Sequence, residues 1–363
     1  MRTIQKSVFV VLAVLALPPV ASAQAPDWVE DLADRIARQV ERHAEQIARL
    51  VEQRIEAQGR RQGRGQARGP EFTEQFSKTV RLGRNGTFGL ENVAGDIVVT
   101  GGSGDDVRIE ATKRVRHPNE AEARAILSEL AVQVQDRNGR VDVRTESPRR
   151  RNWSGSVDYT IAVPRDAAVT LRSISGSIRV TNVNGDLRAE SISGDIVASG
   201  ARRVKALKTV SGNLEITDSE SDELTTGSIS GDIVINKLKA NGLDVQTVSS
   251  DVRMTDVDVD HVGLRSVSGD IDYVGRLQRN GRYQFQSHSG NVRITPIDSR
   301  GFSVDATTFS GELRSDFALT LQSAPGNGFG PRRRNQSIRG SFGDASATLT
   351  LQSFSGNIVI VKR

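Results

Sequence analysis

A short Ser-Gly cassette recurs nine times in the second half of this chain, and its spacing constrains the fold more than any other feature. The steps between successive glycine positions are 18, 18, 19, 19, 19, 21, 21 and 45 residues. A period near 20 residues with one turn per repeat is typical of stacked arrays, in which each repeat buries its apolar side against its neighbours. The copies are Ser175–Ile178, Ser193–Ile196, Ser211–Leu214, Ser230–Ile233, Ser249–Val252, Ser268–Ile271, Ser289–Val292, Ser310–Leu313 and Ser355–Ile358.

The residues around each glycine fall into columns. Apolar residues stand five positions before the glycine and two and four positions after it, with polar residues between them. Alternation with a period of two indicates strands that bury one face. Glycine suits the turn between two strands, where Asp or Asn can bond to the local backbone. We therefore predict an all-β fold, a parallel β-solenoid whose rungs of 18–21 residues are two strands joined at Ser-Gly-Asp, with like residues stacked over like.

The column two positions before each glycine does not fit this alternation, because its residues are apolar although they should point outward. Either a bulge shifts the register and buries the column, which we favour, or the solenoid carries an outward apolar stripe. A contiguous outward stripe would mark an interaction surface. The column consists of Ile174, Ile192, Val210, Ile229, Val248, Val267, His288, Phe309 and Phe354.

The N-terminus predicts export. Residues 1–23 have a positive start, an apolar run at 8–17 and the small-residue cleavage site Ala21-Ser22-Ala23, as in a secretory signal peptide. The run is too short for a stable transmembrane helix and no second candidate follows, so we expect no integral membrane span. The chain has no cysteine, which excludes disulfides and a lipoprotein attachment site. We expect a protein of the periplasm, the cell surface or the medium.

The rest of the chain divides by composition. Residues 27–57 have apolar positions mostly four apart, from Val29 to Ile55, and should form an amphipathic helix that packs on the body or self-associates; a membrane-surface helix is the less favoured alternative. Within the cap, Asn119 and Glu122 predict the start of one helix. The predicted parts are an amphipathic helix at 24–57, a basic flexible linker at 58–70, a β-rich cap at 71–165, and a solenoid at 166–363 with a loop insertion at 323–340.

The sequence resembles those of a bacterial family of exported proteins known as putative adhesins. The resemblance rests on residues 90–97 (Leu-Glu-Asn-Val-Ala-Gly-Asp-Ile), on residues 157–166 with their Tyr-Thr-Ile-Ala-Val-Pro core, and on the Ser-Gly-Asp repeats. It covers about residues 74–363. It implies a β-solenoid with an adhesive or envelope role, and it implies no catalytic residues. Ser250 departs from the pattern by replacing the glycine, and His288 departs by standing in the apolar column.

The sequence gives little support for a catalytic or metal-binding site. A carbohydrate-active or metal-dependent enzyme on a β-helix is the alternative function, but such sites need convergent charged groups, usually with aromatic platforms, and aromatic residues are only 4% of this chain. Asp256, Asp258 and Asp260 stand on one face and could bind a divalent cation, although a solvated outer face is the favoured interpretation. Residues 101–106 resemble one calcium nonapeptide, but a lone copy favours a hairpin turn. We predict no catalytic, cofactor or metal site.

Two arginine clusters provide the candidate ligand-binding residues, and the ligand would be an anionic glycan or a phosphate group. The candidates are Arg149, Arg150, Arg151 with Trp153 beside them, and Arg332, Arg333, Arg334. The formal net charge of +5 is mild and predicts no nucleic-acid partner. The sequence therefore predicts a non-enzymatic protein that binds or scaffolds at the cell envelope or surface. Its expected partners are an envelope or surface macromolecule, such as an anionic glycan or another protein, and a second copy through residues 27–57.

Overall fold

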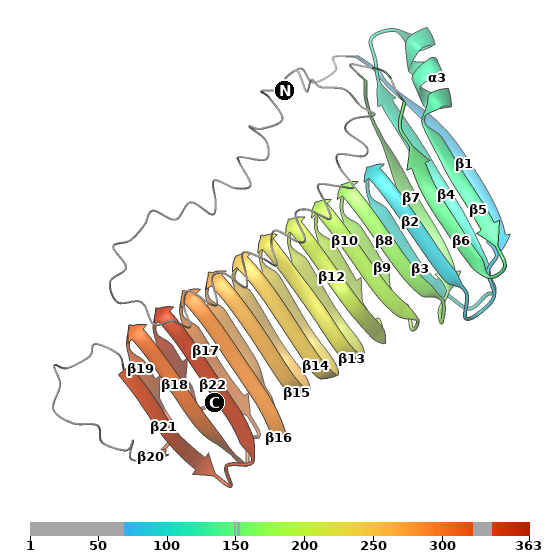
Figure 1. Ribbon diagram of the computed structural model, residues 1–363. Coiled ribbons are helices and arrows are strands. Elements are labelled where there is room, and N and C mark those ends of the chain that lie inside the picture. The colour runs from blue at the N-terminus through green and yellow to red at the C-terminus, as the bar shows by residue number, and fades with distance from the viewer. Residues whose placement is uncertain (1–68, 149, 151–152, 322–335) are drawn as a thin grey trace. The chain divides into compact units, whose positions relative to one another are not determined.

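The computed structural model describes residues 69–148, 150, 153–321 and 336–363 (Figure 1). The predicted signal peptide, the predicted helix at 24–57 and all but two residues of the linker lie outside these residues. The described elements are β1 (Glu71–Arg81), β2 (Thr87–Ala94), β3 (Ile97–Gly102), β4 (Asp106–Arg116), α3 (Glu120–Glu129), β5 (Ala131–Arg137), β6 (Arg140–Glu146), β7 (Ser154–Pro164), β8 (Ala168–Ser175), β9 (Ile178–Thr181), β10 (Asp186–Ser193), β11 (Ile196–Ser199), β12 (Arg203–Ser211), β13 (Leu214–Ser230), β14 (Ile233–Ser249), β15 (Val252–Ser268), β16 (Ile271–Ser289), β17 (Val292–Ile297), β18 (Gly301–Ser310), β19 (Leu313–Ser315), β20 (Thr320–Leu321), β21 (Gln336–Gly343), β22 (Ala347–Ser355) and β23 (Ile358–Ile360).

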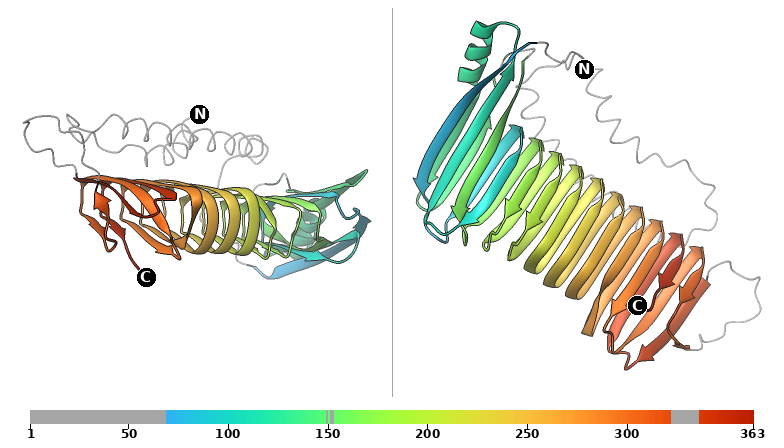
Figure 2. Two further views of the ribbon diagram at one scale, coloured as in Figure 1. Left: turned by 90° about the horizontal axis from the view of Figure 1, so that it is seen from below. Right: turned by 180° about the vertical axis from the view of Figure 1, so that it is seen from behind.

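Each rung has an entry face, which leads into the Ser-Gly-Asp turn, and an exit face, which leaves it. β8 and β10 pair in parallel on the entry face, with Ser193 opposite Ser175, and β9 and β11 pair in parallel on the exit face. The long strands β13 to β16 run along the exit face, bend, and continue along the entry face of the next rung. The strands therefore lie side by side from the cap to the last rungs (Figure 2), and the parallel, like-over-like register is confirmed.

The turn glycines are required by close approach between rungs. Gly269 has φ +122, and a Cβ on it would collide with the carbonyl oxygen of Ser250 in the rung below. Acidic or amide residues at the position after the turn glycine bond to the next rung: Oδ1 of Asp251, in the copy where Ser250 replaces the glycine, accepts the backbone N–H of Asp270 at 2.8 Å, and Oδ1 of Asp270 accepts that of Asn291 at 2.8 Å. Glycine thus sets the spacing of the rungs, and the Asp/Asn column joins them.

A second corner stands six residues after the turn glycine and was not predicted. Asn182, Asp218, Lys237 and Asp256 adopt φ values of 57, 47, 53 and 54° there. Asn and Asp tolerate this left-handed conformation better than most residues, which explains their use at the bend from exit face to entry face. Asp256, which belongs to the acidic run that we interpreted as a solvated outer face, is therefore a corner residue.

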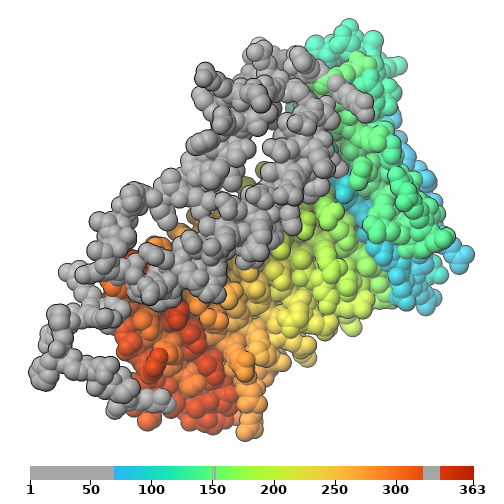
Figure 3. All heavy atoms as spheres, viewed as in Figure 1, coloured from blue at the N-terminus to red at the C-terminus, as the bar shows by residue number. Residues whose placement is uncertain are grey.

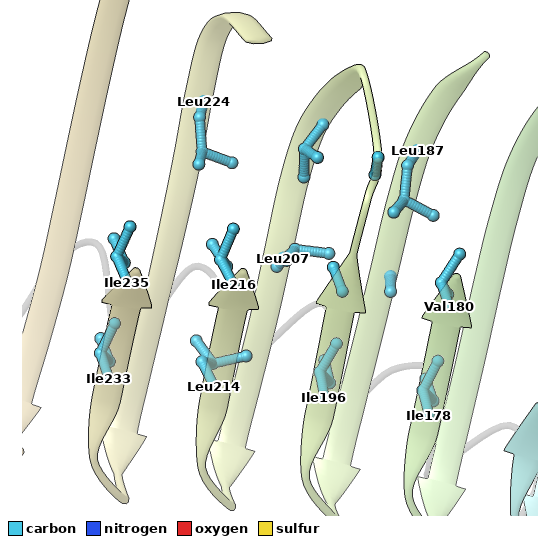
Figure 4. Packing of buried hydrophobic residues seen from close by; sticks show 14 of the residues in the cluster. Ile178, Val180, Leu187, Ile196, Leu207, Leu214, Ile216, Leu224, Ile233 and Ile235 are labelled. Carbon is cyan, nitrogen blue, oxygen red and sulfur yellow. The ribbon is translucent and has the colours of Figure 1, made fainter. Parts of the chain in front are cut away.

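The core lies between the two faces and consists of stacked aliphatic columns. Ile178, Ile196, Leu214 and Ile233 form one column on the exit face (Figure 4), and each is fully buried or nearly so. Leu187, Leu207 and Leu224 face them from the entry side. One Ile or Leu side chain contributes about 1.5–3 kcal/mol when it is fully buried, so the repeated columns stabilise the stack without a large aromatic core.

Part of the segment predicted as the cap forms a rung of the solenoid. β2 and β3, which come from the segment predicted as the cap, already form the first rung: Ala94 pairs with Ser175, and Ile97 pairs with Ile178. Beyond them β7 pairs in parallel with β3 on the exit face, and β4 and β1 follow it in antiparallel order. On the entry face β6 pairs in parallel with β2, and β5 pairs antiparallel with β6. The helix α3 begins as predicted, because the Asn119 side chain accepts the N–H of Glu122 at 3.2 Å.

A buried polar network closes the first rung where the other rungs carry a serine or threonine. The Nδ2 of Asn92 donates to the carbonyl oxygen of Val157 at 2.9 Å, and its Oδ1 accepts from the hydroxyl of Thr145 at 2.8 Å. That hydroxyl also lies 2.7 Å from the Tyr159 phenol, and burial raises the pKa of Tyr159 to about 12. The network satisfies backbone groups that no further rung covers.

The C-terminal rung is not where its sequence position suggests. β22 pairs in parallel with β16 on one side and with β18 on the other, so the last rung of the chain lies between two earlier ones. Of the predicted loop insertion at 323–340, residues 323–335 lie outside the described residues. Residues 336–340 belong to β21, which pairs antiparallel with β18. The order of the rungs in the stack and their order in the sequence therefore differ at this end.

Candidate functional site: an outward apolar ladder

The column two residues before each turn glycine forms a continuous ladder on the outer side of the entry face. The residues that flank it pair in register, such as Thr247 with Ser266 and Ser249 with Ser268 on either side of Val248 and Val267. In the order of the stack the apolar ladder consists of Val93, Ile174, Ile192, Val210, Ile229, Val248, Val267, His288, Phe354 and Phe309.

The ladder points outward, so the favoured prediction of a buried column is wrong. The alternation of β15 holds up to the ladder position: Leu264 and Ser266 are buried, Val267 is half-buried, and Ser268 at the turn is exposed. No bulge shifts the register there. The ladder residues are absent from the side chains that pack against the buried core within the described chain. The space-filling view shows the rungs as parallel bands of side chains (Figure 3).

The serines and threonines beside the ladder explain why this column cannot turn inward. Those that stand three residues before each turn glycine are buried where the two faces converge on the turn, and small hydroxyl side chains fit that space. The Thr209 hydroxyl donates to the carbonyl oxygen of Gly194 at 3.2 Å, and the Thr308 hydroxyl donates to that of Gly356 at 3.0 Å. A valine or isoleucine would leave these carbonyl oxygens without such a donor.

The ladder changes from aliphatic to aromatic at its C-terminal end. The His288 and Phe354 rings stack at 5.0 Å between centroids and 4° between planes, and Phe354 and Phe309 stack at 4.9 Å and 3°. Burial lowers the pKa of His288, which favours the neutral ring in this stack. The three residues meet only because β22 lies between β16 and β18, so their order in sequence does not reveal the stack.

Polar residues line both sides of the ladder. On the turn side stand the exposed serines, such as Ser249 and Ser268, and beyond them the Asp/Asn column. On the other side Arg172 lies 3.3 Å from Glu190, and the Gln286 amide donates to Gln352 at 3.1 Å. The ladder is therefore a narrow apolar band, one residue wide, between two polar borders.

Of the predicted arginine site, the described residues include only Arg150 and Trp153, so the site stays a prediction. Arg150 is paired with Glu129, whose Oε1 accepts from its Nε at 2.8 Å; this pairing raises the pKa of Arg150 and lowers that of Glu129. Trp153 is half-buried and packs against the core. Arg149, Arg151, Arg332, Arg333 and Arg334 lie outside the described residues.

The two candidate cation sites have structural explanations. In the acidic run, Val257 and Val259 are buried, and Asp258 accepts a hydrogen bond from the Gln278 amide. Residues 101–106 connect β3 to β4, which lie on opposite sides of β7, so this turn is not a hairpin. The described chain contains no group of three or more His, Cys, Asp or Glu side chains that could hold a metal ion. Within the same residues, no helix is long and apolar enough to cross a membrane.

Solved structures of several bacterial proteins are similar to this chain at low identity. A putative adhesin from Parabacteroides distasonis is 11% identical with a TM-score of 0.42, over 81% of this chain and 98% of that one. A putative lipid binding protein from the same species is 10% identical with a TM-score of 0.43, over 78% and 96%. A putative adhesin from Parabacteroides merdae is 11% identical with a TM-score of 0.38, over 79% and 96%.

Among curated proteins none matches this chain. A family model does match: that of the toastrack domain DUF4097, over residues 90–361, from the first rung to the last. The match covers the described rungs and most of the cap, and its members have no known catalytic activity. The family resemblance expected from the repeats is thereby confirmed, and the chain belongs to the toastrack DUF4097 family.

Proposed function

We propose that this protein is a non-enzymatic binding or scaffolding protein of the bacterial cell envelope or surface, exported by its N-terminal signal. The observation that carries the proposal is the apolar ladder, because it is an ordered, half-buried apolar surface that the core does not use. Contiguous apolar surface that folding does not require is typical of interaction sites. The regular repetition of the rungs supports a displayed surface rather than a single reactive centre.

Retention on envelope material tests the proposal. The mature chain is immobilised and incubated with a solubilised envelope fraction, beside Val248→Lys in the ladder and Gln246→Lys as a control. Gln246 lies on the same strand and the same outer side, so both variants add the same charge two residues apart. We expect the unmodified chain and Gln246→Lys to retain the same envelope component, and Val248→Lys to retain at least about tenfold less, or ~1.4 kcal/mol. Equal retention by the two variants would contradict the proposal.

The enzyme alternative has its own outcome. The same fraction is incubated with the purified chain, and its polysaccharides are examined for shortening. Depolymerisation by the chain would replace the proposal with a carbohydrate-active function. No described observation favours that function at present, because the charged groups of the outer faces are paired across rungs, as Arg172 is with Glu190 and Lys237 is with Asp218.

A further inference from the structure

The outermost strand of the cap has one free edge. Within the described residues β1 pairs with β4 alone, over 11 residues and without a register shift (Figure 1). A strand in this position presents a row of unpaired backbone groups, which can act as a template for another strand. This edge is separate from the apolar ladder, because β1 continues the exit face and the ladder lies on the entry face.

The backbone groups that face this edge belong to alternate residues of β1. Just before the strand the carbonyl oxygen of Pro70 accepts the N–H of His117 at 3.4 Å, and just after it the N–H of Leu82 donates to Asp105 at 3.0 Å. In an antiparallel ladder, residues that bond to one neighbour alternate with residues that bond to the other. Even-numbered residues of β1 therefore bond to β4, and the N–H and C=O groups of the odd-numbered residues face the free edge.

The residues of β1 form complementary pairs when the strand lies antiparallel to a second copy of itself. With Phe76 opposite its own copy, Glu74 lies opposite Lys78. In the same register Glu71 lies opposite Arg81. The remaining pairs are Phe72 with Val80, Thr73 with Thr79 and Gln75 with Ser77. We propose that β1 pairs antiparallel with β1 of a second copy of this chain, about a two-fold axis at Phe76, so that one sheet continues across two caps.

This register alone combines backbone bonding with complementary side chains. Odd-numbered residues must lie opposite odd-numbered residues, so the other registers differ by shifts of two residues. A shift of two in either direction places Phe76 opposite Lys78 or opposite Glu74. A shift of four places Glu74 opposite Glu74 or Lys78 opposite Lys78, and like charges directly opposite each other destabilise a sheet.

The pairing supplies partners to the two cations of β1. Lys78 and Arg81 are exposed, and neither has an ion-pair partner among the described residues. Lys78 and Glu74 of the other copy form a pair without mutual backbone bonds, where side chains lie closest. A foreign strand with apolar residues on this side would leave both charges unpaired, so the same residues disfavour other occupants.

The acids of β1 have partners in their own chain and can accept a second donor. Oε1 of Glu74 lies 2.7 Å from Nζ of Lys113, and Oε2 of Glu71 lies 2.9 Å from the Arg116 guanidinium. A carboxylate accepts through both of its oxygens. In the proposed sheet each acid therefore lies between one cation of its own chain and one cation of the other copy.

The helix α3 leaves room for the second copy. Nζ of Lys113, which pairs with Glu74, also lies 3.4 Å from the carbonyl oxygen of Leu127 in α3, so the helix lies over the half of β1 that contains Glu74. A two-fold axis at Phe76 places the two copies of α3 over opposite ends of the paired strands.

The other edge strand of the cap lacks this complementarity. Among the described strands β5 pairs with β6 alone, so it too has a free edge. Antiparallel pairing of β5 with its own copy about Val134 would place Val132 opposite Asp136 and Ala131 opposite Arg137. Self-pairing is therefore a property of β1 and not of every edge in the cap.

Sedimentation of the full mature chain at tens of micromolar tests the proposal. Gln75→Pro removes an N–H that faces the free edge, a position where an edge strand tolerates proline, and Gln75→Val is the control that keeps this N–H. Lys78→Glu reverses a charge on the edge, and Arg137→Glu on β5 is its control. We expect the unmodified chain and both controls to form dimers that dissociate on dilution. Gln75→Pro and Lys78→Glu should dimerise at least about tenfold more weakly, with unchanged circular dichroism.

Oxidation of single-cysteine variants tests the register, because the chain has no cysteine of its own. In Phe76→Cys the two cysteines lie opposite each other with Cα atoms about 4.5 Å apart, which suits a disulfide. In the control Ser77→Cys, residue 77 lies opposite residue 75 of the other copy, and the two cysteine Cα atoms are about 8 Å apart, too far for a disulfide. We expect a covalent dimer from Phe76→Cys only.

The contrary outcomes are distinct. A monomeric unmodified chain, or dimers that persist in both Gln75→Pro and Lys78→Glu, would overturn the proposal. Covalent dimers from Ser77→Cys, or none from Phe76→Cys, would exclude the two-fold axis at Phe76. A monomeric chain that retains an envelope protein, and loses it in Gln75→Pro, would assign the edge to a strand of that protein. Dimers that do not retain envelope material overturn only the proposed function, because the ladder is not part of this edge.

Discussion

The entry and exit faces of the same rungs differ on their outer sides. Two residues before the glycine, every position of the entry face is apolar or histidine. Three residues after it, the matching outward column of the exit face contains both valine and charged residues, such as Arg179, Val197, Glu215 and Val234. Both faces pair in parallel along the rungs, and both bury their inner columns. The stack therefore folds with a mixed outer column, and the uniform ladder is a property that folding alone does not demand.

The largest expected effect lies in the turn that both faces share. Gly269→Ala adds a Cβ that collides with the carbonyl oxygen of Ser250 at a positive φ, so we expect a loss of about 2–6 kcal/mol in the free energy of unfolding. Gly263→Ala, on the outer side of β15, is the matched control, because nothing lies within 4 Å of the added Cβ. Denaturant unfolding measures both. Equal losses would show that close approach of the rungs does not explain the turn glycines.

The next prediction separates the inner and outer sides of one strand. Leu264→Ala on β15 empties a fully buried position and should cost about 2–5 kcal/mol. Val267→Ala, three residues along in the ladder, should cost less than about 1 kcal/mol, because its side chain already contacts solvent on one side. A loss of the same size at both positions, in the same unfolding experiment, would mean that the ladder is a second core.

A smaller effect should distinguish the two outer sides. Val234→Lys places a positive charge on the outer side of the exit face, and Val248→Lys places the same charge on the outer side of the entry face, both in β14. Each should change the free energy of unfolding by less than about 1 kcal/mol. Only Val248→Lys should reduce the retention of envelope material, by at least about tenfold. If Val234→Lys reduces it equally, the binding surface is not confined to the entry face.

The smallest predicted effect is the pH dependence of the aromatic end. Burial lowers the folded-state pKa of His288 below its unfolded value near 6.5, so the unfolded chain binds more protons between these two values. The stabilisation by neutral His288 is present above the unfolded pKa and is lost as the pH falls through the folded pKa. The melting temperature should therefore decrease below about pH 6.5 by more than it does in His288→Phe. Parallel melting curves from pH 7.5 to 5 for the two proteins would contradict this.

Much of the fold follows from local patterns, and the misses have identifiable causes. The helix start at Asn119, the parallel register and the turn role of the cassette were predictable because caps, period-two alternation and tight turns depend on residues close in sequence. The corner at Asn182, Asp218 and Asp256 carried a readable signal, a repeated Asn or Asp six residues after the glycine. The arginine site stays a prediction, and the pairing of Arg150 with Glu129 could not be foreseen because an arginine cluster in sequence says nothing of its partners in space.

The sequence by itself determined the rung: its length, its turn, its inner columns and its membership of a stack. Only the tertiary structure decided which rungs are neighbours, because rungs with the same columns can pair in any order. That is why the first rung comes from β2 and β3, why β22 lies between β16 and β18, and why His288, Phe354 and Phe309 form one stack. It also decided the direction of the apolar ladder, because the narrow interior at the turn accepts serine and threonine and leaves the larger aliphatic side chains outside.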